Sequence, residues 1–302
     1  MKFLFLLIYL YSYSISNEFI FQLNPIKLMP NSYYFYGKEE YFSTKNGGDI
    51  ANTSFIITKS SVILIDTGSS ELYGKQIKNA ISKITSKPIK YIINTHHHPD
   101  HFLGNSAFTN SNIYASKFTK EEIENNGELY ITNLTNLVNE AISNTKVKAP
   151  NQILNSKELD FDGYKLKVLY LDGHTKSDVA IYDEKTKILY ASDLIFNKRT
   201  MATPHANINK WIASLKELKN IDFKLSVPGH GVAFENKSVI DENINYLRYL
   251  DNTLKNSAKK GLDIFEILNL PIPKEFNNFT MFKEEFERSV INLYPTYEEE
   301  LN

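Results

Sequence analysis

The sequence contains no cysteine, and this absence excludes several classes of site at once. No disulfide can stabilise the fold, no thiolate can bind zinc, and no lipid anchor can be attached through an N-terminal cysteine. A metal site in this chain must therefore use imidazole and carboxylate ligands, which are the remaining side chains that bind transition metals well.

The chain also lacks an excess of charge of either sign. Its 34 Lys and Arg residues nearly balance its 35 Asp and Glu residues, so the formal net charge is -1. This balance gives no reason to expect nucleic acid or an anionic membrane surface as a partner, because both attract basic proteins. We expect a small-molecule substrate instead. With 302 residues, 42% of them hydrophobic, the chain is long enough to bury a large core.

One unbroken apolar run, residues 3–11, lies close to the N-terminus. It follows Lys2 and precedes Ser14-Ile15-Ser16, small residues of the kind that signal peptidase reads. The run is too short to span a bilayer as a helix. We therefore predict that residues 1–16 are a signal peptide, that the mature protein is exported to the periplasm, and that it has no stable membrane insertion after cleavage. An uncleaved anchor and a buried first strand are the alternatives.

Residues 95–101 read T-H-H-H-P-D-H, in a chain that has only seven histidines. This segment holds four side chains that bind metals: His96, His98, Asp100 and His101. Three imidazoles and a carboxylate suit a pair of borderline divalent cations better than one closed structural zinc, which commonly uses thiolates. The segment therefore predicts a metal site.

The remaining patterns predict two sheets faced by helices. Strands are expected at 54–58 and 62–66, as a hairpin, and at 89–94, 152–154, 158–161, 165–172, 179–182, 188–192 and 224–227. Helices are expected at 72–84 with Ser69 or Ser70 as a cap, at 117–142 with a break at 125–127, at 208–218, and from 237 to the end with an interruption near 271–273. We assign residues 17–236 to one domain and residues 237–302 to a helical C-terminal extension packed on it.

Three further segments place a metal-binding side chain at the end of a predicted strand. They are Asp172-Gly173-His174-Thr175, Ser192-Asp193-Leu194 and Pro228-Gly229-His230-Gly231. Glycine beside histidine allows a sharp turn and a close approach of the imidazole to a crowded centre. Together with the histidine-rich segment, these residues make His174, Asp193 and His230 candidate ligands.

These motifs, in this order, resemble those of the metallo-β-lactamase superfamily, and the resemblance covers residues 53–232. It implies a four-layer αβ/βα sandwich with two metal ions at one edge, between the sheets. The metals are expected to be zinc, although iron and manganese suit the same ligands. Asp66, in Asp66-Thr67-Gly68, matches a residue that supports the site. The implied ligands are His96, His98 and His174 for the first metal, Asp100, His101 and His230 for the second, and Asp193 as a bridge.

This ligand set predicts hydrolysis. Two bridged divalent cations share a water and lower its pKa to around 7, so that hydroxide is available to attack an acyl or phosphoryl centre. Asp100 is the expected catalytic residue, which orients the nucleophile and passes its proton toward the leaving group. The expected substrate is a small ester, thioester, lactone or lactam.

Comparison with branches of the superfamily narrows the interpretation. The absence of cysteine excludes β-lactamases with a cysteine ligand, and His98 stands where flavodiiron proteins carry glutamate. The bridging Asp193 favours relatives of glyoxalase II, but the C-terminal third lacks the basic pattern of a glutathione site. Residues 191–197, the helix with Trp211 and residues 227–231 most resemble the quinoprotein relay system zinc metallohydrolases. That resemblance implies a periplasmic quinoprotein dehydrogenase as a partner.

Two other functions remain open at this point. A mono-iron sulfur oxygenase of the same fold would leave Asp100, His101 and His230 without a metal. A low-turnover accessory protein of a quinoprotein system would bind metal and a protein partner but hydrolyse little.

Several residues near the motifs allow two interpretations. Asn197, Lys198 and Arg199 either reach a substrate carboxylate or phosphate or form a solvated loop. His205 either lines the entrance or is a surface histidine, and we favour the surface. His97 is expected to point away from the cluster, and Trp211 to belong to the core.

Overall fold

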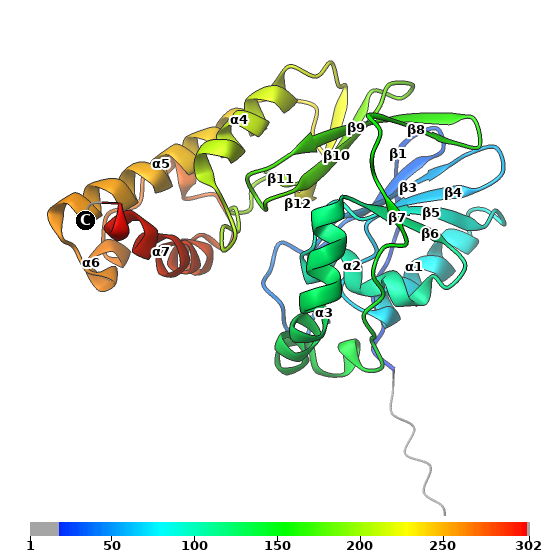
Figure 1. Cartoon of the computed structure of the whole chain (residues 1–302), viewed down its shortest axis with the longest axis horizontal. Helices are drawn as coiled ribbons and strands as arrows, with labels where there is room; N and C mark the ends of the chain where they lie inside the picture. Colours follow the sequence, from blue (N-terminus) through cyan, green and yellow to red (C-terminus); the bar gives the residue numbers. More distant parts are fainter. Residues whose placement is uncertain (1–17, 301–302) are drawn as a thin grey trace, which may run out of the picture.

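Two β-sheets lie face to face in the computed structural model, which describes residues 18–300 (Figure 1). Helices cover the outer face of each sheet, so the predicted four-layer αβ/βα sandwich is confirmed. The predicted signal peptide, residues 1–16, lies outside the described residues.

The first sheet has seven strands in chain order. The first four strands pair antiparallel and the last four pair parallel, with β4 shared between the two parts. The predicted hairpin of β3 and β4 is confirmed. The strands are β1 (Ile26–Met29), β2 (Ser32–Phe35), β3 (Thr53–Ile57), β4 (Val62–Ile65), β5 (Ile89–Ile93), β6 (Asn112–Ala115) and β7 (Gln152–Ile153).

The second sheet has five strands in the order β12-β11-β10-β9-β8. Only β11 and β12 pair parallel, and the other neighbours are antiparallel. The strands are β8 (Glu158–Phe161), β9 (Tyr164–Leu171), β10 (Asp178–Asp183), β11 (Ile188–Phe196) and β12 (Leu225–His230).

The helices divide between the two outer layers. On the first sheet lie α1 (Glu71–Ser82), α2 (Pro99–Phe102), α3 (Lys117–Val138) and the 3₁₀ turns η1 (Leu103–Ala107) and η2 (Asn139–Ile142). The second sheet carries α4 (Ile208–Lys219) and α5 (Ser238–Lys260), followed by α6 (Ile264–Leu268), η3 (Lys274–Phe276) and α7 (Phe282–Glu299). Ser70 begins α1 as predicted, because its hydroxyl accepts a hydrogen bond from the Tyr73 amide at 3.1 Å. The predicted helical C-terminal segment is present (Figure 1).

Three hydrophobic clusters fill the three spaces between the four layers. In β4, Val62 and Leu64 face the helices while Ile63 and Ile65 face the second sheet. In β10, Val179 and Ile181 face the first sheet, and Ala180 and Tyr182 face α4 and α5. This alternation follows from the two-residue period of a strand, so fully apolar strands such as β4 are buried on both faces.

The structure corrects two sequence predictions. The break predicted at residues 125–127 is wrong, because α3 runs unbroken from Lys117 to Val138. Gly127 is buried within this helix, and an added Cβ would lie 2.7 Å from the side chain of Val147, so close packing explains the glycine there. The strand predicted to end at Ser192 continues as β11 to Phe196, with an irregularity at Ser192, whose φ is 48°.

Buried polar contacts attach α7 to the chain that follows β11. The Arg199 guanidinium lies 2.9 Å from a Glu285 carboxylate oxygen, and both side chains are almost completely buried. Thr203 donates a hydrogen bond to Ser289 at 2.7 Å. Among the helices of residues 18–300, none combines the length and the apolar character that crossing a membrane requires.

Candidate metal centre

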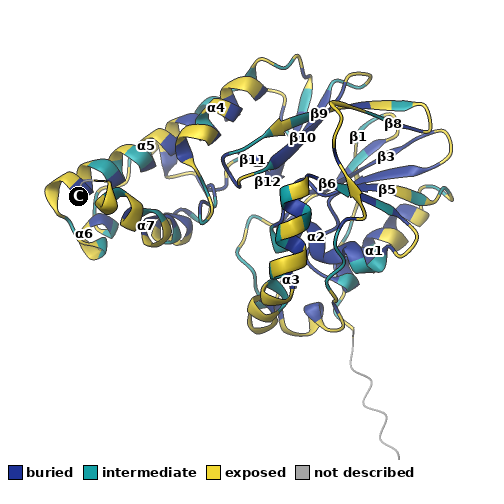
Figure 2. Ribbon diagram, viewed as in Figure 1, coloured by how far each residue is buried: buried dark blue, intermediate teal, exposed yellow. Residues whose placement is uncertain are grey.

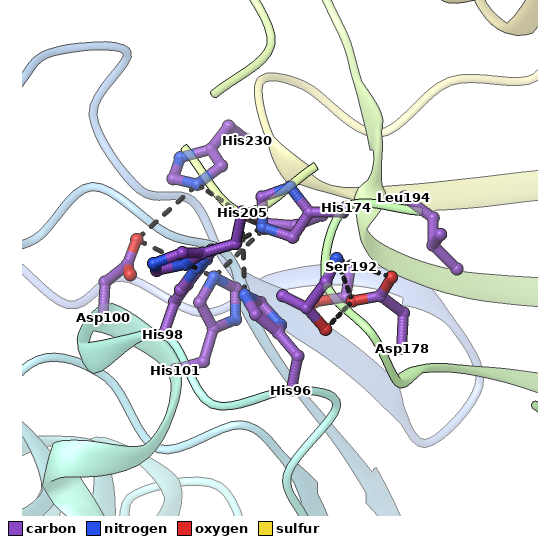
Figure 3. Close-up of polar contacts among 12 residues, drawn as sticks. His96, His98, Asp100, His101, His174, Asp178, Ser192, Leu194, His205 and His230 are labelled. Atoms are coloured by element: carbon purple, nitrogen blue, oxygen red, sulfur yellow. Dashed lines mark hydrogen bonds and ion pairs between the residues drawn. The ribbon is translucent and has the colours of Figure 1, made fainter. Parts of the chain in front are cut away.

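The candidate ligands meet at one edge of the sandwich because the relevant strands end there (Figure 3). β4 and β5 are parallel, so Asp66 and the histidine-rich segment leave the first sheet at the same edge. β9, β11 and β12 run in one direction in the second sheet and carry His174, Asp193 and His230 to the facing edge.

A first group of ligands is formed by His96, His98, His174 and Asp193, whose ligand atoms all lie within 4.8 Å of one another. His174 Nε2 lies 2.8 Å from His98 Nδ1 and 3.3 Å from Asp193 Oδ2. His96 Nε2 lies 3.8 Å from the same carboxylate oxygen. Three imidazoles and a carboxylate around one point are a suitable ligand set for zinc.

A second group is formed by Asp100, His101 and His230. Asp100 Oδ2 lies 3.7 Å from His101 Nε2 and 3.6 Å from His230 Nε2. Asp100 and His101 come from α2, whereas His230 is the last residue of β12, so the group spans both sheets' edges.

Asp193 lies between the two groups and contacts both. Its Oδ1 is 3.0 Å from His101 Nε2, while its Oδ2 is 3.3 Å from the Nε2 atoms of His174 and His230. A carboxylate in this position has the geometry of a ligand shared by two cations.

The donor set passes a test for divalent metal. His96 Nε2, His101 Nε2 and Asp193 Oδ1 are buried and make no hydrogen bond of suitable geometry, although the last two lie 3.0 Å apart. Unpaired buried polar atoms cost about 1–3 kcal/mol each, and these three lie around the same centre. Cations bound by the two groups of ligands would satisfy these three unpaired atoms. The residues present therefore fit the divalent metal ions that the sequence predicts.

Polar neighbours orient the ligand imidazoles. Asp66 Oδ2 lies 2.8 Å from His101 Nδ1, and the Asp66 carboxylate also accepts hydrogen bonds from the amide and hydroxyl of Thr95. His230 Nδ1 donates to the Ile50 carbonyl oxygen at 2.7 Å. Such contacts turn the opposite ring nitrogen toward the metal and fix its tautomer. Asp66 therefore supports the site as expected from the sequence.

Burial and charge set the protonation of the ligands. Burial lowers the pKa of His96 and His98 well below the usual range, and lowers that of His174 to about 3. These imidazoles are thus neutral, which is the form that binds metal. At His101 burial also lowers the pKa, but the charges of Asp193, Asp100 and Asp66 outweigh it and raise the pKa well above 6.5.

Two histidines outside the seven candidate ligands border the site. His97 is buried against Phe118 and Tyr130, but the prediction that it points away from the cluster is wrong, because a ring nitrogen of His97 lies within 4.8 Å of ring nitrogens of His98 and His205. His205 is exposed, and its Nδ1 lies 2.9 Å from His98 Nε2, so it combines a surface position with a contact to a ligand (Figure 3).

The polar residues after Asp193 have structural partners. Asn197 donates to the Val232 carbonyl, and Lys198 pairs with Glu242 on α5 at 2.8 Å. Arg199 borders the cavity in front of the ligands, but its guanidinium is paired with Glu285. Arg199 is therefore buried and paired, whereas Lys198 stays exposed in a surface ion pair, as in a solvated loop.

Sequence reasoning missed three contributors to the site. Thr95 and Ser192 contact each other at 2.7 Å through their hydroxyls and both reach Asp66. Asn52 donates to the carbonyls of Pro228 and Gly231 and so holds the loop that carries His230. The position of Thr95 next to the histidine motif could have indicated its role in the site. No local pattern indicates the role of Asn52, because its partners lie about 180 residues away.

A cavity of about 650 Å³ opens in front of the ligands. His98, Asp100, Asp193 and His230 lie at its base, and the walls come from α3, α7 and the chain around Tyr41. Substrate-sized space therefore adjoins the metal centre.

Comparisons with known proteins agree with this geometry. A family model described as "Metallo-beta-lactamase superfamily" matches residues 46–230. A linear primary-alkylsulfatase of a Pseudomonas species is 23% identical, over 78% of this chain and 53% of its own. The beta-lactamase-like protein 2 homolog of Caenorhabditis elegans is 24% identical, over 72% of this chain and 65% of its own. Metallo-beta-lactamase IND-1 of Chryseobacterium indologenes is 26% identical, over 60% of this chain and 71% of its own. The chain thus spans between half and two thirds of the first two relatives.

Solved structures show the same fold. A metallo-beta-lactamase from Pontibacter korlensis matches with a TM-score of 0.62 and 20% identity, over 75% of this chain and 99% of its own. The mono-zinc form of the metallo-beta-lactamase FIM-1 from Pseudomonas aeruginosa matches with a TM-score of 0.61 and 16% identity, over 75% of this chain and 95% of its own.

Proposed function

The chain belongs to the metallo-beta-lactamase superfamily, and from this premise we propose that it is a hydrolase that uses two zinc ions. The observation that carries the proposal is the position of Asp193 between two complete groups of ligands, one with three histidines and one with two histidines and Asp100.

The roles of the residues follow from their positions. His96, His98 and His174 would hold one ion, Asp100, His101 and His230 the other, and Asp193 both. Bound zinc ions supply an activated water and a Lewis acid at neutral pH.

Asp100 is the proposed catalytic residue. Its carboxylate borders the cavity and lies within 3.7 Å of His101 and His230. It can therefore contact both a substrate in the cavity and a water molecule at the candidate ligands. Its free oxygen orients the attacking water, accepts the proton, and returns that proton to the leaving group.

A small ester, thioester, lactone or lactam is the proposed substrate. The named relatives, an alkylsulfatase and a beta-lactamase, act on different bonds. Membership of the superfamily therefore does not by itself fix which bond this protein hydrolyses. Because the catalytic groups lie at the base of the cavity, its walls select the substrate.

Hydrolysis of a panel of chromogenic esters, thioesters, lactones and lactams tests this proposal. We expect turnover that falls by at least about a hundredfold in Asp193→Asn and Asp100→Asn, because each variant removes a ligand oxygen charge. Glu158→Gln is the matched control, since this carboxylate is exposed on β8 and pairs only with Lys165. Full activity in Asp193→Asn would refute the dinuclear mechanism.

Two other functions predict different results in the same preparation. A mono-iron sulfur oxygenase would contain one iron and consume oxygen with a persulfide, and would leave the second group of ligands empty. A low-turnover accessory protein would hold metal but hydrolyse none of the panel.

We also propose that the protein is exported to the periplasm, that it belongs to the quinoprotein relay branch, and that it contacts a quinoprotein dehydrogenase there. Residues 1–16 support export, and residues 191–197 and 227–231 support the branch. N-terminal sequencing of the protein from its native host should begin near Asn17. A first residue of Met1 in the mature protein would contradict cleavage.

A further inference from the structure

The cavity in front of the metal centre follows one face of α3 over most of its length. Its lining residues on α3 recur every three or four positions, from residue 118 to residue 137. This is the spacing of one helical face. At 1.5 Å per residue the face extends about 28 Å, far more than the catalytic groups require.

The cavity wall on α3 carries aromatic residues and leucines interspersed with the polar residues Glu122, Asn126 and Asn133. Leu129, Leu134 and Leu137 line it from α3, and Tyr41 and Phe42 line it from the chain before β3. Leu129 keeps 56% of its surface exposed, which makes it one of the large apolar side chains most open to solvent in residues 18–300. A single exposed leucine is ordinary, but a leucine in a row of apolar neighbours beside a catalytic centre is typical of a binding surface.

The charged residues that line the cavity from α7 and from the chain after β11 are paired with one another. Arg288 pairs with Glu285 at 2.8 Å and lies over the Tyr41 ring at 5.1 Å. Glu285 also pairs with Arg199. Two arginines against one glutamate leave a net positive charge at this wall, and Glu122 and Lys176 also line the cavity, so charged groups border the apolar row.

We infer that the substrate is an ester whose acyl group is a long, unbranched hydrocarbon chain, which lies along α3 with the ester carbonyl at the ligands. This inference rests on the proposed hydrolase function and names the substrate class. A compact bicyclic lactam would occupy only the part of the cavity nearest His98 and Asp100 and would leave Leu129 exposed. In the reaction, water adds to the acyl carbon, the bond to the leaving oxygen breaks, and that oxygen takes up the water's proton.

A series of p-nitrophenyl esters from acetate to dodecanoate tests the inference. Burial of one methylene group strengthens binding about fourfold when it is complete. We therefore expect kcat/KM to rise at least tenfold from acetate to octanoate. Leu129→Gln and Leu137→Gln should raise KM for octanoate several-fold with little change in kcat, and should leave the acetate reaction unchanged.

The control for these variants is Phe265→Gln, because Phe265 is 77% exposed on α6 and does not line the cavity. It should change neither ester. Equal kcat/KM for all chain lengths, or equal loss for acetate and octanoate in the leucine variants, would overturn the inference while the hydrolase proposal stands.

Binding provides a readout that does not depend on turnover. Calorimetry with the zinc-loaded protein should show that dodecanoate binds at least tenfold more tightly than butyrate, and that Leu129→Gln removes most of this difference. If no ester is hydrolysed but this difference is found, the hydrolase proposal fails and the hydrocarbon site stands. If dodecanoate and butyrate bind equally, the hydrocarbon site is wrong.

Discussion

At the scale of single residues, the position of Asp193 depends on the glycine that faces it. An added Cβ at Gly229 would lie 1.9 Å from Asp193 Oδ1, so any larger residue must displace the carboxylate or the strand. Misplacement of a catalytic group by about 1 Å can reduce a rate by about a hundredfold. Gly229→Ala should therefore lower kcat/KM by about that factor and weaken metal binding, which ester assays and metal titration would measure.

Gly163→Ala is the control for this substitution. Gly163 has a φ of +82° but no atom within 4 Å of an added Cβ, so alanine there meets strain without a clash. We expect a loss of stability of about 1 kcal/mol and unchanged activity. Unchanged activity in Gly229→Ala would show that Asp193 does not need its observed position.

Asp49 should make the stability of the protein depend on pH. Burial raises the pKa of Asp49 to about 6 from its usual 3.8, and a hydrogen bond from Tyr73 only partly offsets this. A raised carboxyl pKa means that the folded state binds the proton more tightly than the unfolded state does. The resulting contribution to the free energy of unfolding is fully present below pH 3.8 and is lost as the pH rises through 6. At pH 8 the charged, buried carboxylate costs up to about 3 kcal/mol.

Asp49→Asn should therefore raise the free energy of unfolding at pH 8 by up to about 3 kcal/mol and change it little at pH 4. Urea denaturation at the two pH values measures this. The control is Asp222→Asn, because the Asp222 side chain is 92% exposed, and it should have an effect below about 0.5 kcal/mol at either pH. A destabilised Asp49→Asn variant at pH 8 would mean that the charge at this position is needed.

The candidate ligands could be predicted from the sequence because most of them lie in short motifs. His96, His98, Asp100 and His101 are within six residues, and a glycine adjoins His230. The contacts of His205 and Asn52 could not be predicted, because each joins segments more than 100 residues apart whose proximity exists only in the folded chain.

At the scale of elements, apolar pattern predicted most strands and helices but not all of them. The runs that form β3, β4 and β5 were evident because they are apolar on both faces. β1 and β2 were missed since each has only four residues and contains a polar residue, and β6 was missed because it begins with the polar Asn112. Gly127 indicated a break in α3 by local propensity, and tertiary packing against Val147 overrides it.

The buried ion pair between Arg199 and Glu285 links α7 to the chain after β11. Glu285→Gln would leave the Arg199 charge buried without its partner, which typically costs about 3–5 kcal/mol. Denaturation in urea should show that loss. Glu242→Gln is the matched control, because it breaks the exposed pair with Lys198 and should cost at most about 1 kcal/mol. Equal losses in the two variants would contradict a structural role for the buried pair.

At the scale of the whole molecule, the four layers explain why the site lies where it does. The two sheets meet face to face over a common core, and the strands that end at one edge carry candidate ligands from both sheets. Figure 2 shows that the strands flanking this edge are mostly buried, while exposed residues occur along α3. A rigid base with a more open wall is a suitable arrangement for fixed chemistry and a selective cavity.

The fold was predictable mainly through the resemblance in the motifs, and less through the order of the elements. Strand and helix patterns alone indicated two sheets faced by helices, but gave no pairing of strands. The parallel pairing of β11 with β12 brings Asp193 and His230 together, and it joins strands separated by α4. Such long-range pairing depends on the core between the sheets and is not written in any local pattern.

The central claim, a centre for two zinc ions, is tested most directly by metal content per chain in protein purified without added metal. The account predicts two zinc ions per chain in the full-length protein, and at most one in Asp193→Ala, because that variant removes the ligand shared by both groups. One iron per chain, with zinc absent and Asp193→Ala unchanged, would contradict it.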